Sequence, residues 1–105
     1  MGEREDLITA ISDFRKHIAG LIPIKRLILF GSRATGKARK ESDIDLLVVS
    51  PAFKNVKSGR GKDLYLFWNL DYPVDFVCYT PEEFEKQKKQ ISLVRMALKE
   101  GIEIA

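Results

Sequence analysis

Apolar residues recur along the first thirty positions with two different spacings. The first set repeats at steps of three and four, as on one face of an amphipathic helix, and consists of Leu7, Ile8, Ile11, Phe14, Ile18 and Leu21. Asp6 is the expected N-cap of this helix, and Gly20 with Pro23 marks its end. The second set is the uninterrupted run 27–30, which ends at Gly31 and is typical of a buried strand.

The middle of the chain alternates between apolar runs and segments rich in glycine and lysine. Residues 44–49 predict a second strand. Residues 51–61 predict a mobile loop, because glycine, serine and lysine dominate there. Residues 64–70 then indicate a short helix, and residues 74–78 indicate a third strand around Asp75.

The last third of the chain contains a clear helix start. Thr80 can cap the helix, Pro81 suits its first turn, and Glu83 completes a capping box. We expect one helix from there to Gly101, with an apolar face made of Phe84, Ile91, Val94 and Leu98. Residues 102–104 would add an edge strand. The order of elements predicts an α/β or α+β fold, with helices packed on a small sheet.

Composition narrows the class of protein. With 105 residues, 45% apolar and 31% charged, we expect one globular domain over residues 1–105 and no disordered polymer. The apolar runs are much shorter than the ~18 residues of a membrane span, and the charged N-terminus lacks the apolar stretch of a signal peptide. The single cysteine, Cys78, cannot form an intramolecular disulfide, so a cytoplasmic location is expected.

Three aspartates are candidates for metal chemistry. Asp43 and Asp45 are two residues apart at the head of an apolar strand, which places them on one face roughly 6–7 Å apart along it. Like charges on one face repel unless a cation compensates, and Mg²⁺ prefers carboxylate oxygens. Asp75 would add a third carboxylate from a neighbouring strand, as in a two-metal clamp. The alternative is that all three are solvated surface charges.

A glycine turn precedes these carboxylates. Because Gly31 and Ser32 follow a strand, their backbone N–H groups and the Ser32 hydroxyl can face an anion. The segment from Gly31 to Gly36 and Lys37 nearly matches a P-loop. However, Ala38 stands where a P-loop carries the Ser or Thr that binds Mg²⁺. We therefore reject the P-loop interpretation.

Together these residues resemble a known signature. Gly31-Ser32, then ten residues, then Asp43-x-Asp45 resembles that of the DNA polymerase β-like nucleotidyltransferase superfamily. The wording Phe-Gly-Ser-Arg-Ala-Thr-Gly and Ser-Asp-Ile-Asp-Leu-Leu-Val is similar to its minimal nucleotidyltransferase (MNT) branch. The segment 74–77 resembles the strand that carries this superfamily's third carboxylate. The resemblance covers about residues 24–105.

The resemblance implies both a fold and a set of roles. The fold is a mixed sheet with helices, the palm of a nucleotidyltransferase. Gly31 and Ser32 would contact the triphosphate of an NTP, with ATP the expected one. Asp43 and Asp45 would bind Mg²⁺, and Asp75 would complete the metal site and help to activate the attacking hydroxyl. That hydroxyl would attack the α-phosphate and release pyrophosphate.

Two basic side chains, Arg33 and Lys37, are further candidates for contact with the triphosphate. Residues 31–63 carry 8 positive and 4 negative side chains, a net charge of +4. Residues 64–105 carry 5 and 7, a net charge of −2. The excess of positive charge is compatible with an anion site, although a solvated loop charge is the alternative for each of the two residues.

The resemblance also bears on the acceptor. MNT proteins are often encoded beside a HEPN-type helical protein, and in some pairs the MNT protein acts as an antitoxin by adenylylating a tyrosine of that partner. We expect the acceptor to come from another chain, since 105 residues leave little room for an acceptor lobe. A homo-oligomer is compatible with the sequence. Neither a membrane nor a nucleic acid is expected as a partner.

Two other functions stay open. The chain would be a non-catalytic subunit if it keeps the motif as a nucleotide sensor and neutralises a helical partner by occlusion. It would be a different transferase if the acceptor is a small molecule or a nucleic-acid end. His17, Cys78 and Trp68 are interpreted structurally, as an exposed helix residue, a small core residue and an aromatic packing residue. Lys86, Lys88 and Lys89 are interpreted as a solvated helix face.

Overall fold

The computed structural model describes residues 2–37 and 42–105 of the chain. Ala38, the residue that departs from the P-loop pattern, lies outside the described residues. In chain order the elements are α1 (Glu3–Ile18), β1 (Arg26–Phe30), α2 (Ser32–Thr35), β2 (Ile44–Val49), the 3₁₀ helix η1 (Pro51–Phe53), α3 (Lys62–Phe67), β3 (Val74–Tyr79), α4 (Pro81–Gln87), α5 (Leu93–Glu100) and β4 (Ile102–Glu103).

The strands form one mixed sheet in the order β3-β2-β1-β4. Strand β1 is antiparallel to both β2 and β4, whereas β2 and β3 are parallel. A parallel pair needs a long crossover, and here η1 and α3 lie between β2 and β3 in the chain. The predicted α/β fold with a small sheet and packed helices is confirmed, including the edge position of the C-terminal strand.

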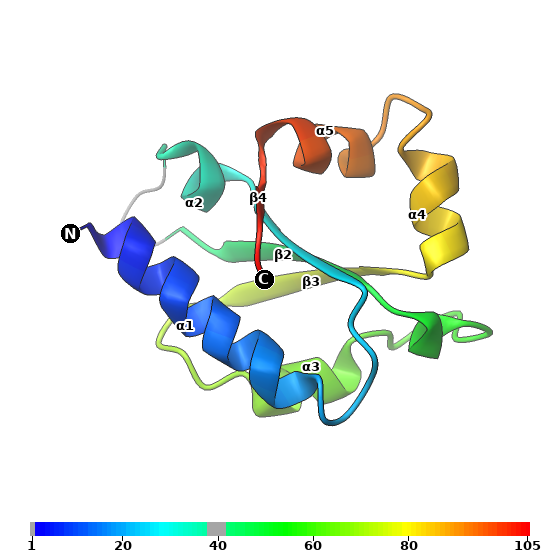
Figure 1. The fold of residues 1–105 in the computed structure, drawn as a ribbon, viewed down its shortest axis with the longest axis horizontal. Helices are drawn as coiled ribbons and strands as arrows, with labels where there is room; N and C mark the ends of the chain where they lie inside the picture. Colours follow the sequence, from blue (N-terminus) through cyan, green and yellow to red (C-terminus); the bar gives the residue numbers. More distant parts are fainter. Residues whose placement is uncertain (1, 38–41) are drawn as a thin grey trace.

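Alternate residues of the central strands enter two separate apolar cores. Leu27 and Leu29 face the core built on α1 and α3, whereas Ile28 and Phe30 face the core built on α4 and α5. Figure 1 shows α1 and α3 together on one side and α4 and α5 on the other. Because both faces are covered, β1 and β2 are apolar at nearly every position. A charged residue inside one of them therefore needs a specific explanation.

The N-terminal helix begins earlier than predicted. It starts at Glu3 with Gly2 as its N-cap, so the expectation that Asp6 caps it is wrong. The backbone N–H of Asp6 already donates to the Gly2 carbonyl at 3.3 Å, which places Asp6 inside the first turn. Arg4 holds this turn against α2 by donating to the Ala34 carbonyl at 2.6 Å. The predicted apolar face is confirmed by the burial of Leu7, Ile11, Phe14 and Ile18.

The prediction of a single helix up to Gly101 is wrong, because the segment forms two helices, α4 and α5. Ser92 makes the break. Its hydroxyl donates to the Gln87 carbonyl at 2.7 Å and accepts the Arg95 N–H at 3.2 Å. Ile91, predicted on the buried face, lies at the corner and is 97% exposed. Two shorter helices both reach the sheet, through the buried side chains of Phe84, Val94 and Ala97.

The predicted start at Thr80 is confirmed as a capping box. The Glu83 N–H donates to the Thr80 hydroxyl at 3.1 Å, and the Thr80 N–H donates to the Glu83 carboxylate at 2.8 Å. That carboxylate also accepts two hydrogen bonds from Arg60. The cap therefore ties the predicted loop 51–61 to α4.

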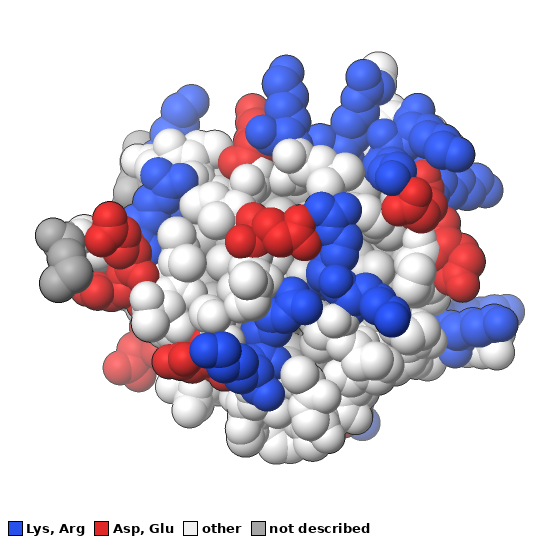
Figure 2. Space-filling view, viewed as in Figure 1, with Lys and Arg blue, Asp and Glu red and all other residues white. Residues whose placement is uncertain are grey.

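The outer face of α4 and α5 is densely charged. Figure 2 shows Lys and Arg side chains gathered over this corner with acidic side chains among them. Lys86, Lys88 and Lys89 are exposed, and Lys88 pairs with Glu85 at 2.7 Å, which confirms the predicted solvated helix face. None of the helices within residues 2–37 and 42–105 is both long and apolar enough to cross a membrane.

Candidate active site

The glycine turn sits where β1 ends. Gly31 adopts φ 76° and ψ −157°, a backbone conformation that glycine tolerates and other residues rarely adopt. It caps α2, a short helix that the sequence analysis missed. Gly36, with φ 81°, ends that helix. A glycine at each end was the available signal, because glycine is favoured just beyond helix ends.

The backbone of Gly31 lies against the carboxylate of Asp45. A Cβ atom added to Gly31 would stand 2.5 Å from Asp45 Oδ2, much closer than real Cβ atoms approach an oxygen. The contact follows from the pairing of Phe30, the last residue of β1, with Asp45 on β2. The absence of a side chain at Gly31 thus makes room for the carboxylate, and the turn and the acid form one site.

Asp45 pairs directly with Asp75 across the parallel strands β2 and β3. Paired residues of adjacent strands point to the same face, with their strands about 4.8 Å apart. Asp43 precedes β2 by one residue and, two positions before Asp45, belongs to the same face. The structure therefore brings the three predicted acids to one end of the sheet.

Burial and like charge act together on Asp45. Burial raises the pKa of its carboxyl above the usual range, and the charges of Asp75 and then Asp43 raise this pKa further. Asp45 is half-buried, whereas Asp43 and Asp75 are exposed. The site concentrates negative charge that a cation would relieve.

This donor set suits Mg²⁺, which prefers carboxylate oxygens and leaves positions for water and phosphate. Within the described residues, no three His, Cys, Asp or Glu side chains already converge as a metal cluster. One carboxylate oxygen of Asp45, Oδ2, lies against the backbone of Gly31. The metal-binding roles of Asp43, Asp45 and Asp75 therefore stay predictions, supported by the chemistry of the donors and by their mutual repulsion.

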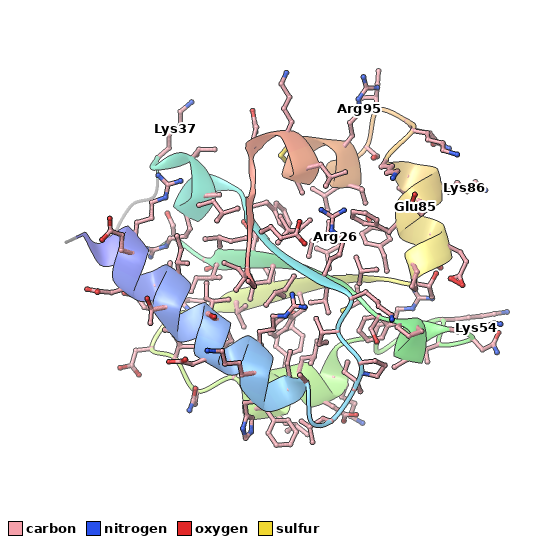
Figure 3. All side chains as sticks on the ribbon, in the orientation of Figure 1. Arg26, Lys37, Lys54, Glu85, Lys86 and Arg95 are labelled. Atoms are coloured by element: carbon pink, nitrogen blue, oxygen red, sulfur yellow. The ribbon has the colours of Figure 1, made fainter. Side chains whose placement is uncertain are left out.

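The two predicted basic contacts have different surroundings. Arg33 donates to the Ser42 carbonyl from Nε at 3.2 Å and from one terminal nitrogen at 2.9 Å. Its guanidinium also lies 4.9 Å from the centre of the Tyr72 ring. Lys37 is exposed on the turn after α2, and Figure 3 shows its side chain pointing away from the body of the protein. Contact of either residue with phosphate stays a prediction.

A cavity of about 400 Å³ lies at the other end of the sheet. Phe53, Leu64 and Phe67 line it, beyond the point where β2 ends. Leu21 also lines this cavity. The prediction that Leu21 lies on the buried face of the first helix is wrong, because α1 ends at Ile18 and Leu21 is 51% exposed. This cavity is separate from the carboxylates, which open β2 and β3 at their first residues.

Comparisons with known proteins show the family and the fold of this chain. The family model described as a nucleotidyltransferase domain matches residues 9–103, a range that includes the glycine turn and all three acids. A crystal structure of a Sulfolobus solfataricus protein, provisionally described as a nucleotidyltransferase, has a similar fold. Its TM-score is 0.68 at 22% identity, and the match covers 95% of this chain and 80% of that one. No curated protein matches the sequence. The chain belongs to the nucleotidyltransferase domain family.

Proposed function

We propose that this chain is a Mg²⁺-dependent nucleotidyltransferase that moves AMP from ATP to a hydroxyl group. The observation that carries the proposal is the packing of the Gly31 backbone on the Asp45 carboxylate, with Asp75 paired beside it. A turn suited to phosphate and a set of carboxylates suited to Mg²⁺ therefore lie together at one end of the sheet. Phosphoryl-group chemistry requires this combination of positioning and charge compensation.

We propose a role for each residue of the site. The backbone N–H groups of Gly31 and Ser32 can face the triphosphate, and the Ser32 hydroxyl can donate to a phosphate oxygen. Bound by Asp43, Asp45 and Asp75, Mg²⁺ would neutralise charge on the phosphates and on the attacking oxygen. The hydroxyl oxygen bonds to the α-phosphorus, and the bond from that phosphorus to the bridging oxygen breaks. Pyrophosphate leaves with the electron pair, and Asp75 accepts the hydroxyl proton.

For the acceptor we propose a tyrosine of a HEPN-type helical partner, modified as in an antitoxin. The support is the likeness of the two motif segments, around Gly31-Ser32 and around Asp43-x-Asp45, to those of the MNT branch. The fold similarity does not bear on the acceptor, because it is a likeness of architecture at 22% identity.

The test is transfer of label from ATP carrying ³²P at its α-phosphate, in Mg²⁺, with the purified chain and its genomic neighbour. We expect label on a partner tyrosine, and a loss of about 10³-fold in Asp43→Asn and Asp45→Asn. Asp63→Asn is the matched control, because Asp63 is an exposed acid on α3 at the far end of the sheet. Label-free neutralisation of the partner that survives Asp43→Asn would instead support the occlusion function.

A further inference from the structure

We propose that Arg33 is a positioning residue for Asp43, and that it acts through the backbone of Ser42. This inference rests on the proposed function, since it concerns the metal-binding role of Asp43. The Ser42 carbonyl accepts two hydrogen bonds from Arg33, at 3.2 and 2.9 Å, and belongs to the peptide bond between Ser42 and Asp43. Because that peptide is planar, fixing its oxygen also fixes the direction in which the chain enters Asp43.

Asp43 needs such an anchor more than the other two acids do. Asp45 and Asp75 lie inside strands and pair with each other in the sheet. Asp43 lies outside, because the pairing of β2 with β3 begins at Ile44, opposite Val74. The first backbone bond at this end joins the Ile44 N–H to the Pro73 carbonyl at 2.8 Å. The peptide bond that precedes Asp43 is held instead by Arg33, which donates to the Ser42 carbonyl.

Arg33 also reaches the segment that leads into β3. Its guanidinium lies 4.9 Å from the centre of the Tyr72 ring, within the range of a cation–π contact. Tyr72 is itself held in place, because its carbonyl accepts the Trp68 indole N–H at 2.8 Å. Trp68 in turn packs edge-on against Phe14 of α1 at 5.0 Å, as predicted for this aromatic residue. The support for Arg33 therefore comes from the core.

One side chain thus links three segments that carry the site. Arg33 belongs to α2, directly after the glycine turn. It bonds the residue before Asp43 and stacks on a residue three positions before Asp75. A planar guanidinium can bond one group in its plane and stack on another at the same time, and a lysine ammonium cannot reproduce this. Groups behind the metal ligands commonly change metal affinity by about 10–100-fold.

The test separates positioning from direct phosphate contact by comparing Arg33→Lys with wild type. Lysine keeps the charge but loses the in-plane pair of bonds. Positioning predicts that Mn²⁺, used in place of Mg²⁺, binds about tenfold more weakly in calorimetry without nucleotide. It also predicts a lower kcat with a nearly unchanged KM for ATP. Arg95→Lys is the control, since Arg95 is exposed on α5 (Figure 3).

The Mn²⁺ affinity and the KM for ATP together distinguish positioning from phosphate contact. Unchanged Mn²⁺ affinity in Arg33→Lys, with a raised KM for ATP, would overturn positioning in favour of phosphate contact. If wild type binds no Mn²⁺ and transfers no label, the proposed function fails first, and this inference fails with it. Should Arg33→Lys not fold, Tyr72→Leu and Tyr72→Phe replace it. A larger loss of Mn²⁺ affinity in the leucine variant supports the stacking contact, and equal affinities contradict it.

Discussion

The carboxylate of Asp45 occupies the space that a side chain at Gly31 would need. A Cβ atom at Gly31 would lie 2.5 Å from Asp45 Oδ2 and 3.7 Å from Asp45 Cβ. The backbone of Gly31 also has a positive φ of 76°, so both the clash and the backbone conformation require glycine here. Any side chain at position 31 would move the acid that the proposed reaction requires.

Gly31→Ala should therefore damage both stability and activity. We expect a loss of about 2–3 kcal/mol in the free energy of unfolding, from a positive φ together with a clash, and a loss of transfer beyond about 10²-fold. Urea unfolding and the labelled-ATP assay measure the two effects. Gly59→Ala is the matched control, since Gly59 has φ 74° but nothing within 4 Å of an added Cβ atom.

A double variant isolates the clash. In Gly31→Ala combined with Asp45→Ala, the oxygen that clashes is gone, so Gly31→Ala should cost less stability in the Asp45→Ala background than in wild type. The free energy of unfolding of the double variant should exceed the value obtained by adding the effects of the two single substitutions, while the double variant remains inactive. Simple additivity would show that the Gly31 effect comes from backbone strain alone.

Asp45→Asn should stabilise the protein at neutral pH while abolishing transfer. The pKa of Asp45 is raised in the folded state, so its ionised form is disfavoured there. The protonated carboxyl therefore stabilises the folded state relative to the ionised one. This contribution is fully present below the pKa of Asp45 in the unfolded chain and is lost as pH rises through its pKa in the folded protein. After solvent screening we expect about 0.5 kcal/mol, or roughly 2–4 °C in Tm. The gain should shrink as pH falls through the raised pKa of the folded state and be gone below the unfolded value of about 4. Thermal unfolding without divalent cations at several pH values measures it, and a constant gain at all pH values would contradict the electrostatic cause.

Glu83→Gln should destabilise the protein with the opposite pH dependence. The hydrogen bonds from Arg60, and then the Thr80 N–H, lower the pKa of Glu83. Its contribution is present above the unfolded pKa and lost as pH falls through the folded one. We expect a loss of about 0.5–1 kcal/mol at pH 7 that disappears below about pH 4. Glu82→Gln is the control in the same helical turn, because Glu82 is exposed, and equal losses in both variants would exclude the cap as the cause.

Cys78 should react slowly with alkylating reagents in the folded protein. Burial raises the pKa of its thiol to about 11 from 9.0, which reduces the thiolate at neutral pH about 100-fold. The sulfur also packs near Gly61, where an added Cβ atom would meet it at 3.0 Å. We expect iodoacetamide labelling at pH 8 to be at least about 100-fold slower in buffer than in 8 M urea, as followed by mass spectrometry. Similar rates in the two conditions would show that β3 exposes the thiol.

The sequence predicted best where the signal is local. The strand over 27–30 and the capping box at Thr80 depend on neighbouring residues, and both are confirmed. The errors occurred where two local signals compete. Apolar spacing favoured a continuous helix through Ile91, whereas Ser92 forms a cap that divides it. Burial decided between them, because two short helices cover the sheet.

By itself the sequence determined the α/β class, the glycine turn and which acids could bind a metal. Only the tertiary structure decided that Asp75 pairs with Asp45, that Gly31 lies on the Asp45 carboxylate, and that Arg33 is turned onto Ser42. The physical reason is that these relationships depend on strand register and chain crossing. Both are set by the packing of segments far apart along the chain, and spacing within a motif carries no information about them.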